Sequence, residues 1–482
     1  MMRELSSAPG RTRGLSSLSD RVVRGVLPTE RPPSVPDMEA LLSVETGPTP
    51  RVWVDASART LEAFLIARCH LDDIAGATAL VETHFADGRL RVAGSLHPAT
   101  RSTLLSAVSE VYSAAGQPRR AGLYAAAAVS YASDAPSEYR AHAVRSLAYA
   151  LNGEIGSAAQ SIERCRAIER ESGWAAVYRD YSGQLAEILV ASSALDARTL
   201  TRLAGEMRET APRDPFWEYT ARAAEAMGAL ISRDYARGLA LLTTLVGGAD
   251  ALTSHAMVRG FALGVYADTL LARGEARRAL AVVRDAESPA EHALCYGMQR
   301  ATAHLVLGRD RSVLDATDAC ISMGPEHCVR TLVPVLVRRA IAQLRLGNPA
   351  GALTTFEEAF SLCESLGEPF TPFIALPTEP LEELLTMLVA RHPEKSAPVE
   401  RLRSGLASVP TREAPVSLPP FSPREERLAL LLRGSRSLPQ IADELNVSLN
   451  TVKSQLRSIY AKLEVSGRES AVAVLESQGF FI

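Results

Sequence analysis

The sequence has few aromatic residues and no long apolar run. Phenylalanine, tryptophan and tyrosine make up 5% of the chain. No apolar stretch approaches the roughly 18 residues that a membrane-spanning helix needs, and the first residues lack the apolar segment of a signal peptide. We therefore expect a cytoplasmic protein that has no membrane partner.

Sequence motifs of the common enzyme classes are missing as well. The chain contains no GxxxxGKS/T loop for nucleotide phosphates, no GxSxG nucleophile turn and no HExxH zinc motif. Its nine histidines are dispersed, without serine, cysteine or aspartate partners at a recognisable spacing. These absences predict a protein that is not an enzyme, is not controlled by ATP and has no cofactor.

The six cysteines include no CxxC pair, which favours reduced thiols packed as small apolar side chains. Cys320, His327 and Cys328 are near neighbours and are candidate metal ligands. Their spacing fits no zinc pattern, however, and a fourth ligand is missing. The sequence therefore predicts structural thiols and no metal site.

Alanine, leucine and arginine are abundant instead, and these residues favour helices because their side chains lose little rotamer freedom there. The 482 residues, 47% of them hydrophobic, are enough for about three domains. We expect an all-α fold. The net charge of −3 gives no overall attraction to nucleic acid, so any DNA contact requires a local group of basic side chains.

The sequence divides into four predicted segments, and the first and third are rich in proline. Residues 1–56 contain seven prolines, which predicts a flexible arm rich in proline, arginine and serine; its arginines either contact DNA phosphates or are solvated. Residues 408–420 contain four prolines, and we place a linker at 401–420. These segments bracket a helical region at 57–400, and a separate domain follows at 421–482.

The region 57–400 repeats a short pattern at intervals of about 34 to 40 residues. A turn residue is followed, five positions later, by a small or compact residue on the next helix. A left-handed turn residue closes the first helix, and the small side chain lets the second helix pack closely. One doubled interval requires a further copy near 193–196. The pairs are Gly116 and Ala121, Gly153 and Ala158, Arg233 and Gly238, Gly274 and Ala279, Gly308 and Val313, and Gly347 and Ala352.

This pattern resembles tetratricopeptide repeats, which stack helical hairpins into a solenoid. The resemblance implies a surface for a protein or small-molecule effector, or for a second copy of the chain; the alternative is a scaffold that only spaces or pairs the C-terminal domains. Aromatic side chains here either line a ligand groove or pack in the core. They are Trp174, Tyr178, Tyr181, Trp217 and Tyr219.

Residues 421–482 predict four short helices from their capping residues. Ser422 with Glu425, Ser437 with Gln440, and Ser466 with Glu469 have the spacing of reciprocal capping boxes. Ser448 is the expected N-cap of the third helix, after a short turn at Asn446 and Val447. The second and third helices, about 438–445 and 449–463, have helix-turn-helix proportions.

The third helix separates apolar from polar side chains. Leu449, Val452, Leu456, Ile459 and Leu463 form one apolar stripe, which we expect to pack on Ile441, Ala442 and Leu445. The remaining face is polar or basic and contains no acid before Glu464. That face comprises Asn450, Thr451, Lys453, Ser454, Gln455, Arg457 and Ser458.

Such a face suits double-stranded DNA, because a helix fits the major groove and cations neutralise phosphates. Lys453 and Arg457 are four residues apart and project together. Asn450 and Thr451 lie in the first turn, near the free amides, and Lys462 is better placed for the backbone than for bases. An ordinary amphipathic helix with a solvated face is the alternative.

The same residues carry a family resemblance. SPRE at 422–425, IA at 441–442, NTVK at 450–453, LR at 456–457, IY at 459–460, KL at 462–463, VS at 465–466 and Arg468 resemble the LuxR-type helix-turn-helix. The resemblance implies that Lys453, Ser454 and Arg457 face the bases of the major groove. Asn450, Thr451, Gln455, Ser458 and Lys462 then contact the DNA backbone or support the helix. It also implies pairing through the last helix, from Arg468 to about Gln478, as a homodimer on DNA.

The whole chain most resembles MalT-like regulators, which join tetratricopeptide-like repeats to this C-terminal domain, but it lacks their nucleotide-binding domain. We therefore expect a bacterial, cytoplasmic and nucleoid-associated transcription regulator that binds specific DNA sequences. The competing hypothesis is a helical-repeat interaction scaffold whose C-terminal domain binds protein. The basic face of the third helix favours DNA, because a protein partner does not demand an acid-free helix.

Overall fold

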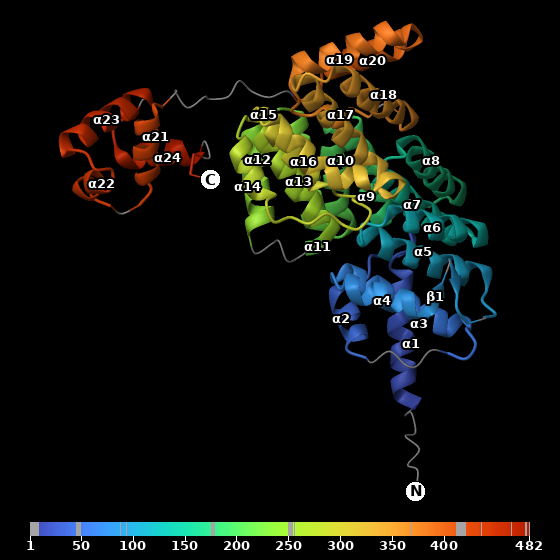
Figure 1. Ribbon diagram of the computed structural model, residues 1–482. Coiled ribbons are helices and arrows are strands. Elements are labelled where there is room, and N and C mark those ends of the chain that lie inside the picture. Colours follow the sequence, from blue (N-terminus) through green and yellow to red (C-terminus); the bar gives the residue numbers. More distant parts are fainter. Residues whose placement is uncertain are drawn as a thin grey trace.

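The computed structural model describes residues 9–44, 50–86, 88–92, 94–174, 179–248, 254, 256–367, 369–410, 421–434, 436–463, 465–477 and 480–481. Within these ranges the chain is almost entirely helical (Figure 1). A two-stranded antiparallel ladder joins β1 (Phe85–Ala86) to β2 (Arg89–Leu90). The all-α prediction is therefore confirmed. Among these helices, none combines the length and the apolar character that crossing a membrane requires.

Successive helices from α3 to α20 pair as hairpins, and the first helix of each hairpin packs on the first helix of the next. The pairs are α3 (Asp55–His70) with α4 (Ile74–His84), α5 (Pro98–Ala114) with α6 (Pro118–Tyr131), α7 (Ala135–Asn152) with α8 (Ile155–Ser172), α9 (Tyr181–Ser193) with α10 (Ala197–Thr210), α11 (Pro215–Ile231) with α12 (Tyr235–Gly247), α13 (Ala256–Ala272) with α14 (Ala276–Val282), α15 (Tyr296–Val306) with α16 (Asp310–Ser322), α17 (Val329–Arg345) with α18 (Pro349–Ser365), and α19 (Thr378–Arg391) with α20 (Ser396–Leu406). Short 3-10 helices lie at η2 (Gly324–Glu326), η3 (Thr371–Phe373) and η4 (Pro393–Lys395).

The turns between paired helices follow the predicted pattern. The predicted turn residues all have positive φ, from +61° at Arg233 to +97° at Gly153. The extra copy expected near 193–196 is present, because α9 ends at Ser193 and Leu195 has φ +55°. The structure adds one copy that the sequence pattern missed, with Asp72 at φ +64° and Ala77 fully buried. Eight of the nine hairpins therefore close through a left-handed residue, with a buried residue five positions later. The exception is the turn between α19 and α20, where His392 has φ −129°.

The hairpins curve until later ones touch the turns of earlier ones. The guanidinium of Arg259 on α13 lies 2.6 Å from the carboxylate of Asp72 in the first turn. Arg330 Nε donates to the carbonyl of Leu151 at 3.0 Å. The Phe370 amide donates to the carbonyl of Ser193 at 3.1 Å, so contacts of this kind recur at sequence separations near 180 residues. The chain therefore completes a superhelical turn, so that later hairpins lie against earlier ones.

The N-terminal segment differs from the flexible arm predicted for 1–56. Helices α1 (Pro9–Arg24) and α2 (Val35–Leu42) pack on α3, and Val22, Met38 and Leu41 lie in the same core as α3 and α5. Proline is tolerated because Pro36 occupies the first turn of α2, where the Ser34 side chain caps the amide of Asp37. Residues 1–8 and 45–49 of the predicted arm lie outside the described residues.

The predicted linker at 401–420 begins too early. Helix α20 continues to Leu406, Val409 is buried, and the carbonyl of Pro410 accepts a hydrogen bond from the Ala375 amide at 3.1 Å. These contacts place residues 401–410 in the helical domain. Residues 411–420 of the predicted linker lie outside the described residues.

The C-terminal domain contains the four predicted helices, namely α21 (Pro423–Leu431), α22 (Leu438–Glu444), α23 (Leu449–Lys462) and α24 (Arg468–Ser477). They form a separate unit (Figure 1) and enclose a hydrophobic core of their own. Leu428 of α21, Ile441 of α22, Ile459 of α23 and Leu475 of α24 are all fully buried in it. Because each helix contributes one apolar face to this core, the opposite faces are left to solvent or a ligand.

Candidate nucleic-acid interface

Capping side chains fix where the first three helices of this domain begin. Ser422 and Glu425 form the predicted capping box on α21, and Ser437 and Gln440 form the one on α22. The Ser448 hydroxyl accepts from the amide of Thr451 at 3.1 Å and caps α23 as predicted.

The third predicted capping box, Ser466 with Glu469, is wrong. Helix α24 begins at Arg468, and the amide of Ala471 bonds to the carbonyl of Gly467 at 2.9 Å. The N-cap position is therefore Gly467, because Ser466 lies one residue too early to cap this helix.

A tight turn sets the angle between α22 and α23. Asn446 has φ +53°, and the amide of Val447 bonds to the carbonyl of Ala442 at 3.0 Å. Asparagine suits this place because its short polar side chain tolerates the left-handed conformation. The predicted short turn is confirmed, and the two helices pack directly on each other.

The apolar stripe of α23 faces inward as predicted, with one exception. Val452, Leu456, Ile459 and Leu463 are buried against Ile441 and Ala442, with Leu445 packed at the edge. Leu449 is only half-buried and lies outside this core. It starts the helix, where no neighbouring element covers it fully.

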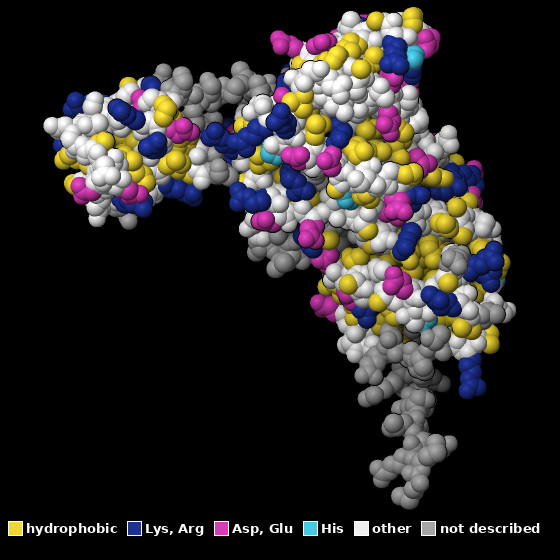
Figure 2. All heavy atoms as spheres, viewed as in Figure 1, with side chains coloured by type: hydrophobic (Ala, Val, Ile, Leu, Met, Phe, Trp, Pro, Cys, Tyr) yellow, Lys and Arg dark blue, Asp and Glu magenta, His cyan; other side chains and the backbone are white. Residues whose placement is uncertain are grey.

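The opposite face of α23 is open. Asn450, Lys453, Ser454 and Arg457 are exposed, and Thr451 and Gln455 are half-buried. Neither Lys453 nor Arg457 forms an ion pair within the part of the chain that the structure describes. Figure 2 shows dark blue basic side chains on the C-terminal domain. The face therefore carries two uncommitted positive charges one helical turn apart.

Ser458 and Lys462 are arranged differently from the rest of the predicted site. Both turn toward α21, where the carboxylate of Glu425 accepts from the Ser458 hydroxyl at 2.6 Å and from the Lys462 ammonium at 2.7 Å. The same carboxylate accepts from the Ser422 amide at 2.7 Å. These bonds, the Lys462 bond above all, lower the pKa of Glu425 to about 2. Ser458 is thus half-buried rather than exposed, and Glu425 joins α23 to α21.

Arg468 has a role that the sequence pattern did not reveal. Its guanidinium donates to the carbonyls of Leu432, Gly434 and Arg436, at 3.0, 2.6 and 2.6 Å. These carbonyls lie beyond Leu431, the last residue of α21, where a carbonyl no longer accepts a hydrogen bond from an amide of the same helix. Arg468 therefore fastens the loop between α21 and α22 to the start of α24.

The C-terminal residues close the core of this domain. Phe480 is buried and lies edge-to-face with Phe421, with ring centroids 5.7 Å apart. Val472 and Val474 on α24 are half-buried and pack on the same core. Ile482 lies outside the described residues.

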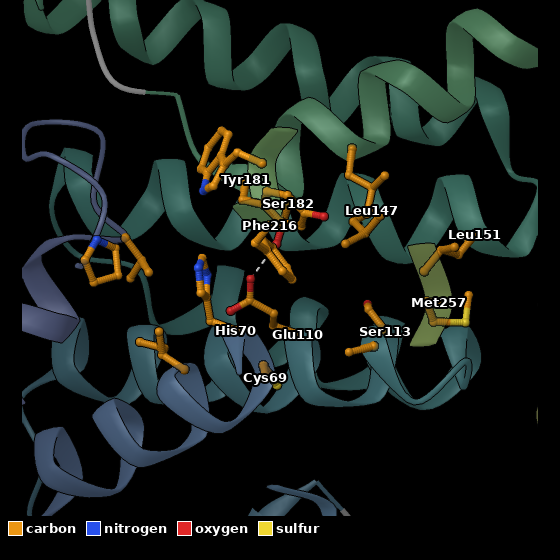
Figure 3. Close-up of a pocket in the computed structure, with 16 residues that line it drawn as sticks. Cys69, His70, Glu110, Ser113, Leu147, Leu151, Tyr181, Ser182, Phe216 and Met257 are labelled. Atoms are coloured by element: carbon orange, nitrogen blue, oxygen red, sulfur yellow. Dashed lines mark hydrogen bonds between the residues drawn. The ribbon is translucent and has the colours of Figure 1, made fainter. Parts of the chain in front are cut away.

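The helical domain contains a cavity between the first helices of six hairpins (Figure 3). Residues from α3, α5, α7, α9, α11 and α13 line it, and most of its wall is apolar. Its polar groups include Glu110, whose carboxylate accepts from the Ser182 hydroxyl at 2.9 Å and pairs with Arg140 at 2.5 Å. Arg140 also pairs with buried Asp180. The cavity therefore combines an apolar wall with one anchored carboxylate.

The aromatic candidates divide between this cavity and the core. Tyr181 and Trp217 line the cavity. Trp174 packs edge-to-face on Tyr139, and Tyr219 is buried with its hydroxyl bonded to the carbonyl of Leu245. Tyr178 lies outside the described residues.

The cysteine and histidine candidates are arranged differently from the sequence expectation. The Cys328 thiol turns away and donates to the carbonyl of Leu151 at 3.1 Å. Cys320 and His327 instead lie beside His292 and Cys295, so four side chains of the types that can ligate a metal lie together in the described chain. The expected absence of a fourth ligand is therefore wrong, because the superhelix brings together residues that local spacing does not.

Comparison with known proteins covers only the C-terminal domain. Residues 419–475 match the family described as bacterial regulatory proteins, luxR family. No curated protein matches the chain significantly. The matched range contains α21, α22 and α23 in full and most of α24. The C-terminal domain is thus a LuxR-type helix-turn-helix domain.

Proposed function

We propose that the chain is a sequence-specific, DNA-binding transcription regulator in which α23 enters the major groove. The observation that carries this function is the open, acid-free face of α23 within a domain of the luxR family. Two cations on that face have no acidic partner among the described residues. A phosphate backbone supplies the missing negative charge.

Different residues of α23 contact the bases, contact the phosphates or support the helix. Lys453, Ser454 and Arg457 are exposed on one side and read base edges. Asn450 and Thr451 lie in the first turn, where the helix N-terminus favours a phosphate oxygen. Gln455 supports this face from its half-buried position, whereas Ser458 and Lys462 act indirectly, through Glu425.

The helical domain receives the signal in this proposal. Its left-handed turns and buried small residues support a tetratricopeptide-like solenoid. The cavity at Tyr181 and Trp217 is lined mostly by apolar side chains, which favours a small molecule there over a long peptide. The carboxylate of Glu110 selects a ligand that offers a hydrogen-bond donor beside an apolar or aromatic body. Two C-terminal domains pair through α24 on a two-fold DNA site.

A selection of bound sequences from random duplex DNA tests the DNA-binding function. The full chain and its Lys453→Ala, Arg457→Ala double variant are run in parallel, with unfolding curves to show that both are folded. A short two-fold motif enriched by the unmodified chain and lost in the variant supports the proposal. Equal enrichment by both chains, or enrichment by neither, contradicts it and favours the protein-binding scaffold.

A further inference from the structure

Four metal-binding side chains from three segments meet in the second half of the helical domain. His292 and Cys295 lie just before α15, Cys320 lies on α16, and His327 precedes α17. Their ligand atoms all lie within 4.8 Å of one another. Cys295, Cys320 and His327 are buried, and His292 is half-buried. The four side chains therefore converge on one point, with His292 at its partly exposed edge.

Three of the distances between these atoms are close to those of a tetrahedral site. Cys295 Sγ lies 3.4 Å from Cys320 Sγ, Cys320 Sγ lies 3.7 Å from His292 Nδ1, and His292 Nδ1 lies 3.2 Å from His327 Nε2. With Zn–S bonds of about 2.3 Å and Zn–N bonds of about 2.0–2.1 Å, neighbouring ligands of a tetrahedron are roughly 3.3–3.8 Å apart. A disulfide requires about 2.05 Å between sulfurs, and both thiols are free.

The orientation of His327 is a second, independent indication. Its Nδ1 lies 2.9 Å from the carbonyl oxygen of Cys328. Because a carbonyl only accepts, Nδ1 carries the hydrogen and the lone pair of Nε2 points into the cluster. Histidines that bind metals are usually oriented in this way by a carbonyl behind the ring.

Charge balance also suits a divalent cation. Two thiolates and two neutral imidazoles bring a charge of −2, which Zn²⁺ cancels, so a buried site carries no net charge.

We infer that His292, Cys295, Cys320 and His327 form a tetrahedral Zn²⁺ site. Binding converts two thiols into thiolates, and their two protons pass to solvent without any change of oxidation state. All four coordination positions are filled by protein, which is the arrangement of a structural rather than a catalytic zinc.

Residues next to the site contact two earlier hairpins of the helical domain. The Arg119 amide of α6 donates to the carboxylate of Glu291 at 2.9 Å. Arg330 donates to the carbonyl of Leu151 at the end of α7. Glu291 adjoins His292, and Arg330 lies three residues after His327. Zinc bound to both histidines would link the segments that make these two contacts, so the metal would stabilise the packing of later hairpins on earlier ones.

The test uses the full chain, reduced, freed of metal with a chelator and titrated with Zn²⁺ and Co²⁺. Cobalt reports its ligands by absorption, since tetrahedral Co²⁺ has strong visible bands and thiolate ligands add charge-transfer bands. We expect one ion per chain, both sets of bands, and a higher melting temperature with zinc. A reduced, folded chain without stoichiometric metal or thiolate bands overturns the proposal.

Variants identify the ligands. Cys320→Ser and the half-exposed His292→Gln should each weaken Zn²⁺ binding by at least the roughly 10- to 100-fold that losing an outer-shell partner costs. Cys328→Ser is the matched control, because its buried side chain adjoins His327 but bonds to Leu151. Unchanged affinity in Cys320→Ser and His292→Gln, or equal loss in the control, contradicts the assignment. A Cys295–Cys320 disulfide in a chain that binds no metal also overturns it.

Discussion

The ammonium of Lys462 lies 2.7 Å from the carboxylate of Glu425, which is 37 positions earlier in the chain. This contact joins the end of α23 to the start of α21. A residue that the sequence identified as a helix cap thus also orients the helix that carries the site.

Replacing Glu425 by glutamine should destabilise the C-terminal domain at neutral pH and lower its DNA affinity, although position 425 lies off the exposed face of α23. The pKa of Glu425 is lowered to about 2, so its stabilisation is present above the ordinary value of 4.5 and is lost as the pH falls through about 2. Thermal unfolding across this range checks the sign. Glu426→Gln, on an exposed neighbour, is the control; an unchanged acid profile in Glu425→Gln would refute the role of the contact.

Lys453→Ala and Arg457→Ala should each weaken binding to the selected DNA site by about 1–3 kcal/mol and relax the preference at one base position. Neither should alter the unfolding curve, since both side chains are exposed. Titrations at several salt concentrations on specific and random duplexes measure both effects. Arg311→Ala, an exposed arginine of the helical domain, should leave both affinities unchanged. A uniform loss on all duplexes would assign these two cations to phosphates instead.

Gly153→Ala should destabilise the helical domain more than Gly347→Ala. Both glycines have positive φ, +97° and +80°, so both replacements should cost about 1–2 kcal/mol in backbone strain. A methyl group at Gly153 would also lie 2.8 Å from Arg330 Cβ, whereas space is open at Gly347. Overpacking should add roughly 1–3 kcal/mol. Equal losses of unfolding free energy in the two variants would argue against the close contact between Gly153 and Arg330.

Arg140→Met should destabilise the chain by roughly 3–5 kcal/mol, because it leaves the carboxylates of Glu110 and Asp180 without their buried partner. Burial already raises the pKa of Asp180. The matched control is Arg208→Met, which pairs with Glu218 and Glu225 at the surface and should cost less than about 1 kcal/mol. Denaturant unfolding compares them, and similar losses would show that the buried network contributes little.

Periodic patterns made much of the fold predictable. The turn residues from Gly116 to Gly347 fixed most hairpins, because a left-handed residue and a small side chain five positions later are both local requirements. The packing of α1 and α2 was missed, since seven prolines suggested an arm and the apolar contacts of Met38 and Leu41 come from α3 and its neighbours. The end of the helical domain was misplaced for the same reason, as Val409 is buried by distant residues.

The sequence by itself determined the all-α character, the hairpin turns and the cations of α23, because helix caps, turns and apolar stripes involve residues a few positions apart. Only the tertiary structure decided that Ser458 and Lys462 donate hydrogen bonds to Glu425. It also decided that His292 and Cys295 lie beside Cys320 and His327. These groupings depend on how hairpins stack and curve. Small packing rotations accumulate along the superhelix and bring distant segments together, and no short sequence pattern contains that sum.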